Sequence, residues 1–250
     1  MEKENRPIMD TSASYLRVEL NTLAENGLRL AIPPRGELAQ GSIDYLNAQG
    51  WDTSLLAPET RKLTVEVAPN VSVFKLRADD AVTALRKGAI DIAILGADVI
   101  AEARLDKDNP ADFIQFNPLG FGACSFRMAF PFARTPFEPE DLSYYLVEKN
   151  MKIATSLPNL LIAILKEQKC MIDRNDLLVM TGSVESALDL YQYSVFAIAD
   201  RVSSGQTMLL NHLRPDWALW ESPGAYLTTR RDFFERNIYK KPESRYFSFT

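Results

Sequence analysis

The first part of the chain alternates short apolar runs with sharp turns. Residues 28–33 form an apolar run that ends at two prolines, and a helical pattern follows it. The runs at 63–67 and 71–76 alternate apolar and polar residues, and the Pro69-Asn70 turn between them predicts a β-hairpin. These patterns are typical of half-buried strands in a sheet.

A helix and a buried strand follow, and the second half of the chain repeats the alternation. Residues 79–87 have helical spacing and end at Gly88, and residues 90–95 form an apolar run that ends at Gly96. Further strands are predicted at 126–132, 152–155, 177–180 and 195–199, with one helix capped by Ser156 and another over 183–190. Strands and helices in alternation favour an α/β fold.

The two ends of the chain depart from this pattern. Residues 1–27 are polar, with Leu16, Leu20 and Leu23 at helical spacing, which predicts a short amphipathic helix. Residues 226–250 mix basic and aromatic side chains. Such a mixture favours a docking tail or interface over a surface that stacks on nucleic-acid bases.

Composition narrows the classes of function. A net charge of -5 argues against a broad nucleic-acid surface, and no apolar stretch approaches the ~20 residues of a membrane span. No apolar run follows the charged start, so we expect no secretory signal and a cytoplasmic protein. Cys124 and Cys170 are then expected to be reduced and buried, and the single histidine, His212, excludes a His-rich zinc site.

The strongest candidate site lies between a strand and a helix near residue 200. Asp200 precedes a turn made of Ser203, Ser204, Gly205, Gln206 and Thr207. Successive backbone N–H groups in such a turn point into one concavity, and the helix N-terminus adds positive potential. A phosphate could bind there, with Asp200 accepting hydrogen bonds from ribose hydroxyls. A capped turn without any ligand explains the segment equally well.

Three other strand ends carry weaker signals. Arg35 places a cation at the turn after the first strand, and Gly96 ends a buried strand where open α/β sheets bind ligands. Ser183 and Glu185 open a helix. A solvated arginine, a close-packed turn and an ordinary N-cap would explain these features without a ligand.

Taken in order along the chain, these segments resemble the ATP phosphoribosyltransferase family. The matching segments are 28–33, 35–36, 77–80, 88–96, 119–122, 126–131, 152–160, 182–185 and 202–208. The resemblance covers roughly residues 28–230, and its strength lies in the order of the motifs rather than in any one of them.

The resemblance implies a two-lobed α/β fold similar to type II periplasmic binding proteins, with a mixed sheet flanked by helices in each lobe. Lobe I would comprise 28–121 plus 204–225. Lobe II would comprise 122–203, with the phosphoribosyl pyrophosphate loop at its end. Residues 1–27 would be an N-terminal extension and 226–250 a C-terminal tail.

The resemblance also implies a glycosyltransferase that catalyses the first step of histidine biosynthesis. Such an enzyme transfers the phosphoribosyl group of phosphoribosyl pyrophosphate to N1 of ATP and releases pyrophosphate. The turn that begins at Ser203 would hold the 5-phosphate, and Asp200 and Glu185 would face the ribose.

The resemblance also implies that Arg35, Arg61 and the Gly96 turn lie along the nucleotide and pyrophosphate side of the site. Magnesium would be held through the substrate phosphates, and no residue is assigned as an acid or a base. Alignment of the substrates and stabilisation of developing charge would supply most of the rate.

The expected partners follow from the same likeness. The chain ends shortly after the matching region, as in the short form of the family, which lacks a C-terminal regulatory domain. By resemblance, short forms work with a regulatory subunit similar to histidyl-tRNA synthetase. We therefore expect a homodimer or a hetero-oligomer with that partner, and neither a membrane nor a nucleic acid.

Two positions and one segment depart from the family's pattern. Glu37 stands where the family often has arginine, and Gln206 replaces a common arginine. Residues 193–196 replace the usual Gly-x-Ala-Asp. The alternative to the enzyme is therefore a catalytically degenerate paralogue, or a small-anion or nucleotide binding protein of the same fold.

Overall fold

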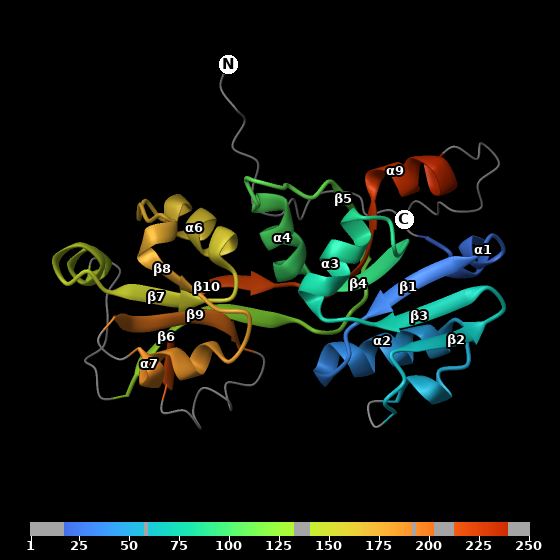
Figure 1. Ribbon diagram of the computed structural model, residues 1–250, viewed down its shortest axis with the longest axis horizontal. Coiled ribbons are helices and arrows are strands. Elements are labelled where there is room, and N and C mark those ends of the chain that lie inside the picture. The colour runs from blue at the N-terminus through green and yellow to red at the C-terminus, as the bar shows by residue number, and fades with distance from the viewer. Residues whose placement is uncertain (1–17, 58–59, 133–140, 192–193, 203–212, 240–250) are drawn as a thin grey trace, which may run out of the picture. The chain divides into compact units, whose positions relative to one another are not determined.

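The chain divides into two compact units, each built on one sheet (Figure 1). The computed structural model describes residues 18–57, 60–132, 141–191, 194–202 and 213–239. The first unit comprises 1–122 and 223–250, and the second comprises 123–222. The predicted α/β architecture, with a mixed sheet flanked by helices in each half, is confirmed.

The first unit has a six-stranded sheet in the order β2-β3-β1-β4-β11-β5. Its central strand β1 is parallel to both β3 and β4, whereas β2 is antiparallel to β3, and β11 is antiparallel to β4 and β5. The strands are β1 (Leu28–Ile32), β2 (Thr64–Ala68), β3 (Val71–Lys75), β4 (Ile92–Gly96), β5 (Phe113–Pro118) and β11 (Ala225–Arg230).

Helices cover both faces of this sheet. Alternate strand residues such as Leu30 and Ile94 share one core with Leu46 of α2 and Phe234 of α9. Figure 1 shows α3 and α4 side by side on the face opposite α2. The helices are α1 (Leu20–Ala24), α2 (Gly36–Ala48), η1 (Ser54–Leu56), α3 (Ala78–Arg86), α4 (Ala97–Leu105), α9 (Arg231–Phe234) and the π-helical turn η5 (Glu235–Tyr239).

The second unit has a five-stranded sheet in the order β10-β6-β9-β7-β8. Strand β7 is parallel to β8 and β9, and β6 is antiparallel to β9 and β10. The strands are β6 (Cys124–Pro131), β7 (Lys152–Thr155), β8 (Leu177–Val179), β9 (Val195–Val202) and β10 (Leu213–Ser222).

Short helices surround the second sheet. Ala154 and Ile198 pack against Val184 and Ala187, and Figure 1 shows α6 on the face opposite α7. The helices are α5 (Asp141–Ser143), the π-helical turn η2 (Tyr144–Glu148), α6 (Pro158–Glu167), η3 (Arg174–Asp176), η4 (Val184–Ser186) and α7 (Ala187–Leu190).

The C-terminal part of the sequence is placed differently from the expectation. Residues 226–230, expected within a tail, belong to β11, which is buried between β4 and β5. Strand β10, expected in lobe I as part of 204–225, pairs with β6 in the second sheet. Both strands gain backbone partners from segments about a hundred residues away, which local patterning does not reveal.

Two predicted helix caps are also corrected. The N-cap of α6 is Leu157 rather than Ser156, and its backbone N–H donates to Thr155 Oγ1 at 3.1 Å. Ser183 adopts a left-handed conformation with φ 50° and makes no side-chain cap to η4. The expected helix over 183–190 is therefore a 3-10 turn followed by a single α-helical turn.

Two further expectations from composition concern the cysteines and membrane-spanning segments. Neither Cys124 nor Cys170 forms a disulfide, and both are partly exposed, so the expectation that they are buried is wrong. None of the helices in the described ranges combines the length and apolarity needed to cross a membrane.

Candidate active site

Three helices begin at one edge of the first sheet. Strands β1, β3 and β4 are parallel, so Ile32, Lys75 and Gly96 end at the same carboxyl edge. Helices α2, α3 and α4 follow these strands directly, and no side chain caps any of the three N-termini within the described residues. The backbone N–H groups and partial positive charges of three helix N-termini therefore gather where α/β sheets bind anions.

Arg35 lies at this edge as the N-cap of α2. Its backbone is extended and its side chain is exposed. Gly36 follows with φ 79°, a left-handed conformation that a glycine adopts without strain. The turn thus places Arg35 next to the first N–H groups of α2.

Arg61 also lies at this edge of the sheet, in the segment that leads into β2. Strand β2 is antiparallel to β3, with Thr64 opposite Phe74, so the segment leading into β2 lies beside the carboxyl end of β3. Arg61 is exposed in that segment. The topology therefore brings two predicted residues, Arg35 and Arg61, to one sheet edge.

Gly96 ends β4 and is the N-cap of α4. A methyl group at this position would overlap Oδ1 of Asp98, which lies in the first turn of α4 and is 2% exposed. The glycine is therefore required by close packing of the Asp98 carboxylate against the turn.

Sequence reasoning missed three polar residues of this edge. Arg77 is the exposed N-cap of α3, Lys75 is buried at the end of β3, and Asp98 is buried in α4. The available signal was position: each lies at or just after the carboxyl end of a strand. The burial of Lys75 and Asp98 gave no signal in the sequence, because charged residues in short elements usually face water.

The second sheet has its own carboxyl edge, formed by β7, β8 and β9. Glu185 is half-buried in η4, which follows β8 after the Gly182-Ser183 turn. Asp200 lies in β9, in register with Arg127 of β6. Parallel pairing thus brings the strand end beside Glu185 and the end of β9 to the same side of the sheet.

The expected phosphate-binding turn comes directly after β9 in the sequence. Strand β9 ends at Val202. Ser203, Ser204, Gly205, Gln206 and Thr207 lie outside the described residues, as does His212.

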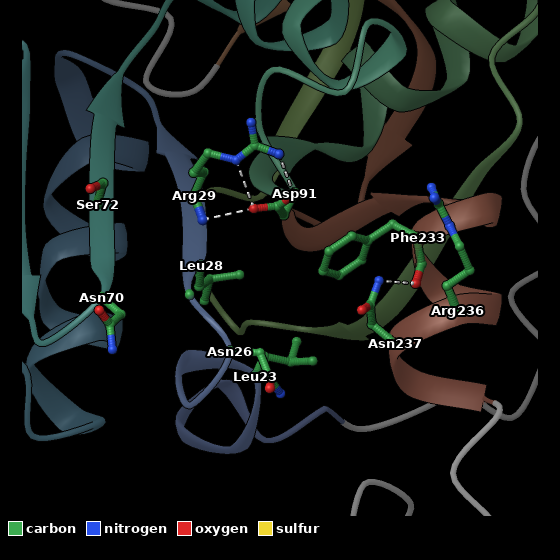
Figure 2. A pocket seen from close by; sticks show the side chains of 11 residues that line it. Leu23, Asn26, Leu28, Arg29, Asn70, Ser72, Asp91, Phe233, Arg236 and Asn237 are labelled. Atoms are coloured by element: carbon green, nitrogen blue, oxygen red, sulfur yellow. Dashed lines mark hydrogen bonds and ion pairs between the residues drawn. The ribbon is translucent and has the colours of Figure 1, made fainter.

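A cavity of about 580 Å³ lies at the opposite, amino edge of the first sheet (Figure 2). Its charged groups are internally paired. Arg29 Nη2 donates to Asp91 Oδ1 at 2.7 Å, and these side-chain hydrogen bonds raise the pKa of the guanidinium. Arg236 is paired with Asp232. None of the predicted site residues that the structure describes lines this cavity.

Comparison with known proteins matches both units. A family model described as ATP phosphoribosyltransferase matches residues 77–241. The ATP phosphoribosyltransferase of Moorella thermoacetica is 30% identical over 192 residues, which are 76% of this chain and 78% of that protein. The ATP phosphoribosyltransferase of Mycobacterium sp. (strain KMS) is 33% identical over 190 residues, and the match spans 59% of its length.

Solved structures agree on the fold. The ATP phosphoribosyl transferase (HisG:HisZ) complex from Thermotoga maritima aligns with a TM-score of 0.57 at 22% identity, over 83% of this chain and 90% of that one. A Candida albicans protein with the generic periplasmic binding protein fold aligns with a TM-score of 0.52 at 12% identity, over 84% of this chain and 65% of that one. The fold is thus similar to type II periplasmic binding proteins, as expected. Because the family model spans both units and the Moorella protein is matched over most of its length, this chain belongs to the ATP phosphoribosyltransferase family.

Proposed function

We propose that this chain is a catalytic subunit that transfers the phosphoribosyl group of phosphoribosyl pyrophosphate to N1 of ATP. Its family supports this reaction, the first step of histidine biosynthesis. The observation that carries the proposal is the gathering of three helix N-termini with Arg35, Arg61 and Arg77 at one sheet edge. Positive potential at such an edge suits a substrate pair that carries a triphosphate and a diphosphate.

The reaction is a substitution at C1 of the ribose. The lone pair of adenine N1 forms the new bond to C1, and the bond between C1 and the pyrophosphate oxygen breaks with its electron pair leaving on pyrophosphate. The arginines and N–H groups of the first sheet's edge would stabilise that growing negative charge. Since they are fixed before the reaction, little reorganisation is needed at the transition state.

The second sheet's edge would hold the ribose 5-phosphate. In this proposal Glu185 and Asp200 accept hydrogen bonds from ribose hydroxyls, and backbone N–H groups of residues 203–207 bind the phosphate. The residue that ends β9, Val202, leads directly into that segment. Support comes from the shared carboxyl edge of β8 and β9 and from the family's motif order.

Magnesium is proposed as the metal of the reaction. Within the described residues no group of three or more His, Cys, Asp or Glu side chains is placed to hold a metal ion. In this proposal the ion is carried mainly by substrate phosphates and water, as magnesium often is. When bound, it would neutralise charge on the departing pyrophosphate, while the arginines hold the same group.

We further propose that this chain acts in the cytoplasm. It would form a homodimer, or a hetero-oligomer with a regulatory subunit as the short form of the family does. Support for a regulatory subunit comes from the HisG:HisZ complex of Thermotoga maritima, whose catalytic fold this chain shares.

A specific observation keeps the binding-protein alternative in view. Glu37 is exposed in the first turn of α2, where it puts a negative charge at the edge proposed for polyphosphates. A degenerate paralogue would retain substrate affinity without turnover.

The phosphate-binding assignment is tested by Gly205→Asp. This change adds a side chain and a negative charge where a phosphate is proposed to approach the backbone, so calorimetry should show no binding of phosphoribosyl pyrophosphate. Thr207→Ala should weaken binding by ~1.5–3 kcal/mol, the loss of one hydrogen bond to a charged group. ATP affinity is the control and should change little. Parent-like binding of phosphoribosyl pyrophosphate by Gly205→Asp would show that the 5-phosphate binds elsewhere.

A further inference from the structure

Lys75 is a buried lysine whose ammonium group is bound by neutral oxygens. It ends β3 and is 7% exposed. Its Nζ donates to the Ala57 carbonyl at 3.0 Å and to Thr60 Oγ1 at 2.9 Å, with the Thr60 carbonyl at 3.5 Å. Three oxygens thus surround a group that has three hydrogens to donate.

Burial of the Lys75 ammonium group costs free energy of folding. That cost indicates a role for the segment that the lysine binds. Burial removes hydration from the ammonium, and no carboxylate among the described residues forms an ion pair with it. A methionine would fill a similar volume without that cost. The lysine is therefore explained by its effect on the segment around Thr60 rather than by its own packing.

The two residues that flank Arg61-Lys62 are both fastened to Lys75. On one side, the Lys75 side chain binds Thr60. On the other side, the Lys75 backbone N–H donates to the Leu63 carbonyl at 2.8 Å. Thr60 is further fixed because its hydroxyl donates to the Leu55 carbonyl at 2.8 Å. One residue thus holds both ends of the short stretch that carries Arg61.

We infer that Lys75 is a positioning residue that acts through Arg61. It fixes the backbone of Arg61 at the carboxyl edge of the first sheet. The guanidinium can then contact the nucleotide or pyrophosphate without a loss of backbone entropy on binding. The inference rests on the proposed function, because that function gives Arg61 a polyphosphate to contact. Lys75 itself touches no substrate in this account.

A double-mutant cycle tests the inference. Lys75→Met, Arg61→Ala and the double variant are compared with the parent for kcat, KM and pyrophosphate affinity. Lys75→Met should lower kcat/KM roughly tenfold to a hundredfold, as misplacement of a binding group does. In the Arg61→Ala background the same change should have an effect below about twofold, because the residue through which it acts is gone.

Controls separate positioning from folding. Lys87→Met removes an exposed lysine at the far end of α3 and should leave all parameters unchanged. If Lys75→Met does not fold, Thr60→Val removes one oxygen that binds the ammonium, and the same cycle with Arg61→Ala decides the question. Near-parent circular dichroism of each variant is required.

The outcomes are distinct. Equal losses from Lys75→Met with and without Arg61, or no loss from Arg61→Ala itself, would overturn the inference. If the parent makes no product, the proposed function fails, but the cycle in pyrophosphate affinity still decides whether Lys75 acts through Arg61. A loss confined to the Arg61-containing background supports it.

Discussion

Glu37 combines a favourable local role with an unfavourable place in the proposed site. It lies exposed in the first turn of α2, where an acidic side chain interacts well with the helix dipole. The same turn follows Arg35, at the edge proposed to bind polyphosphates. Local helix stability and substrate electrostatics therefore favour opposite charges at this position.

Glu37→Arg should tighten the binding of ATP or phosphoribosyl pyrophosphate about fivefold at low salt, since one exposed charge near a partly screened site has an effect of that order. The gain should shrink as salt is added. Titration calorimetry at two ionic strengths measures it. Unchanged affinity for both substrates at low salt would show that the Glu37 side chain points away from the bound phosphates.

Gly96→Ala should destabilise the protein by about 1–3 kcal/mol, the usual cost of an added methyl in a close-packed region. The methyl would overlap Asp98 Oδ1, and Asp98 is too buried to move away freely. Gly182→Ala is the matched control, because nothing lies within 4 Å of the added carbon there and its φ is not left-handed. Thermal unfolding compares the two. Equal midpoints would mean that the Gly96 turn relaxes easily.

At the scale of elements, β11 is an interior strand of the first sheet. It lies between β4 and β5, and its first five residues are all buried. Two of them are threonines with no exposed surface, Thr228 and Thr229. The Thr229 hydroxyl donates to the Asp91 carbonyl at 2.7 Å, just before β4, which ties the last strand to the central ones.

Thr229→Val should therefore lower the free energy of unfolding by about 1 kcal/mol or somewhat more, because a buried carbonyl loses its hydroxyl partner while the volume is kept. Thr228→Val is the control, since its hydroxyl makes only a 3.5 Å contact with the Tyr226 carbonyl. Urea unfolding of both variants gives the comparison. A control variant that is as destabilised as Thr229→Val would contradict this account of β11.

The elements that the sequence predicted are those whose signals are local. The hairpin of β2 and β3 follows from alternation around a turn, and Asn70 there adopts φ 63°. Strand β7 coincides with its predicted range. Most of strand β11 was expected in a C-terminal tail because residues 226–250 mix basic and aromatic side chains. Its burial depends on pairing with a strand more than a hundred residues earlier.

At the scale of the whole molecule, the predicted site residues that the structure describes group by sheet edge. Arg35, Arg61 and Gly96 lie at the carboxyl edge of the first sheet, and Glu185 lies at that of the second. Strand order alone accounts for this, because parallel strands end at one edge. Lys75 escaped prediction because the segment that covers it comes from another part of the chain.

The central claim is that this chain joins ATP to the phosphoribosyl group. The most direct measurement incubates the protein with ATP, phosphoribosyl pyrophosphate and magnesium, and follows phosphoribosyl-ATP and pyrophosphate together, with and without a regulatory subunit of the histidyl-tRNA synthetase-like type. The account predicts that both products form in a one-to-one ratio, and that neither forms when either substrate is left out. Binding of both substrates with no product in any of these mixtures, including one with Glu37→Arg, would contradict it and identify the chain as a binding protein of the family.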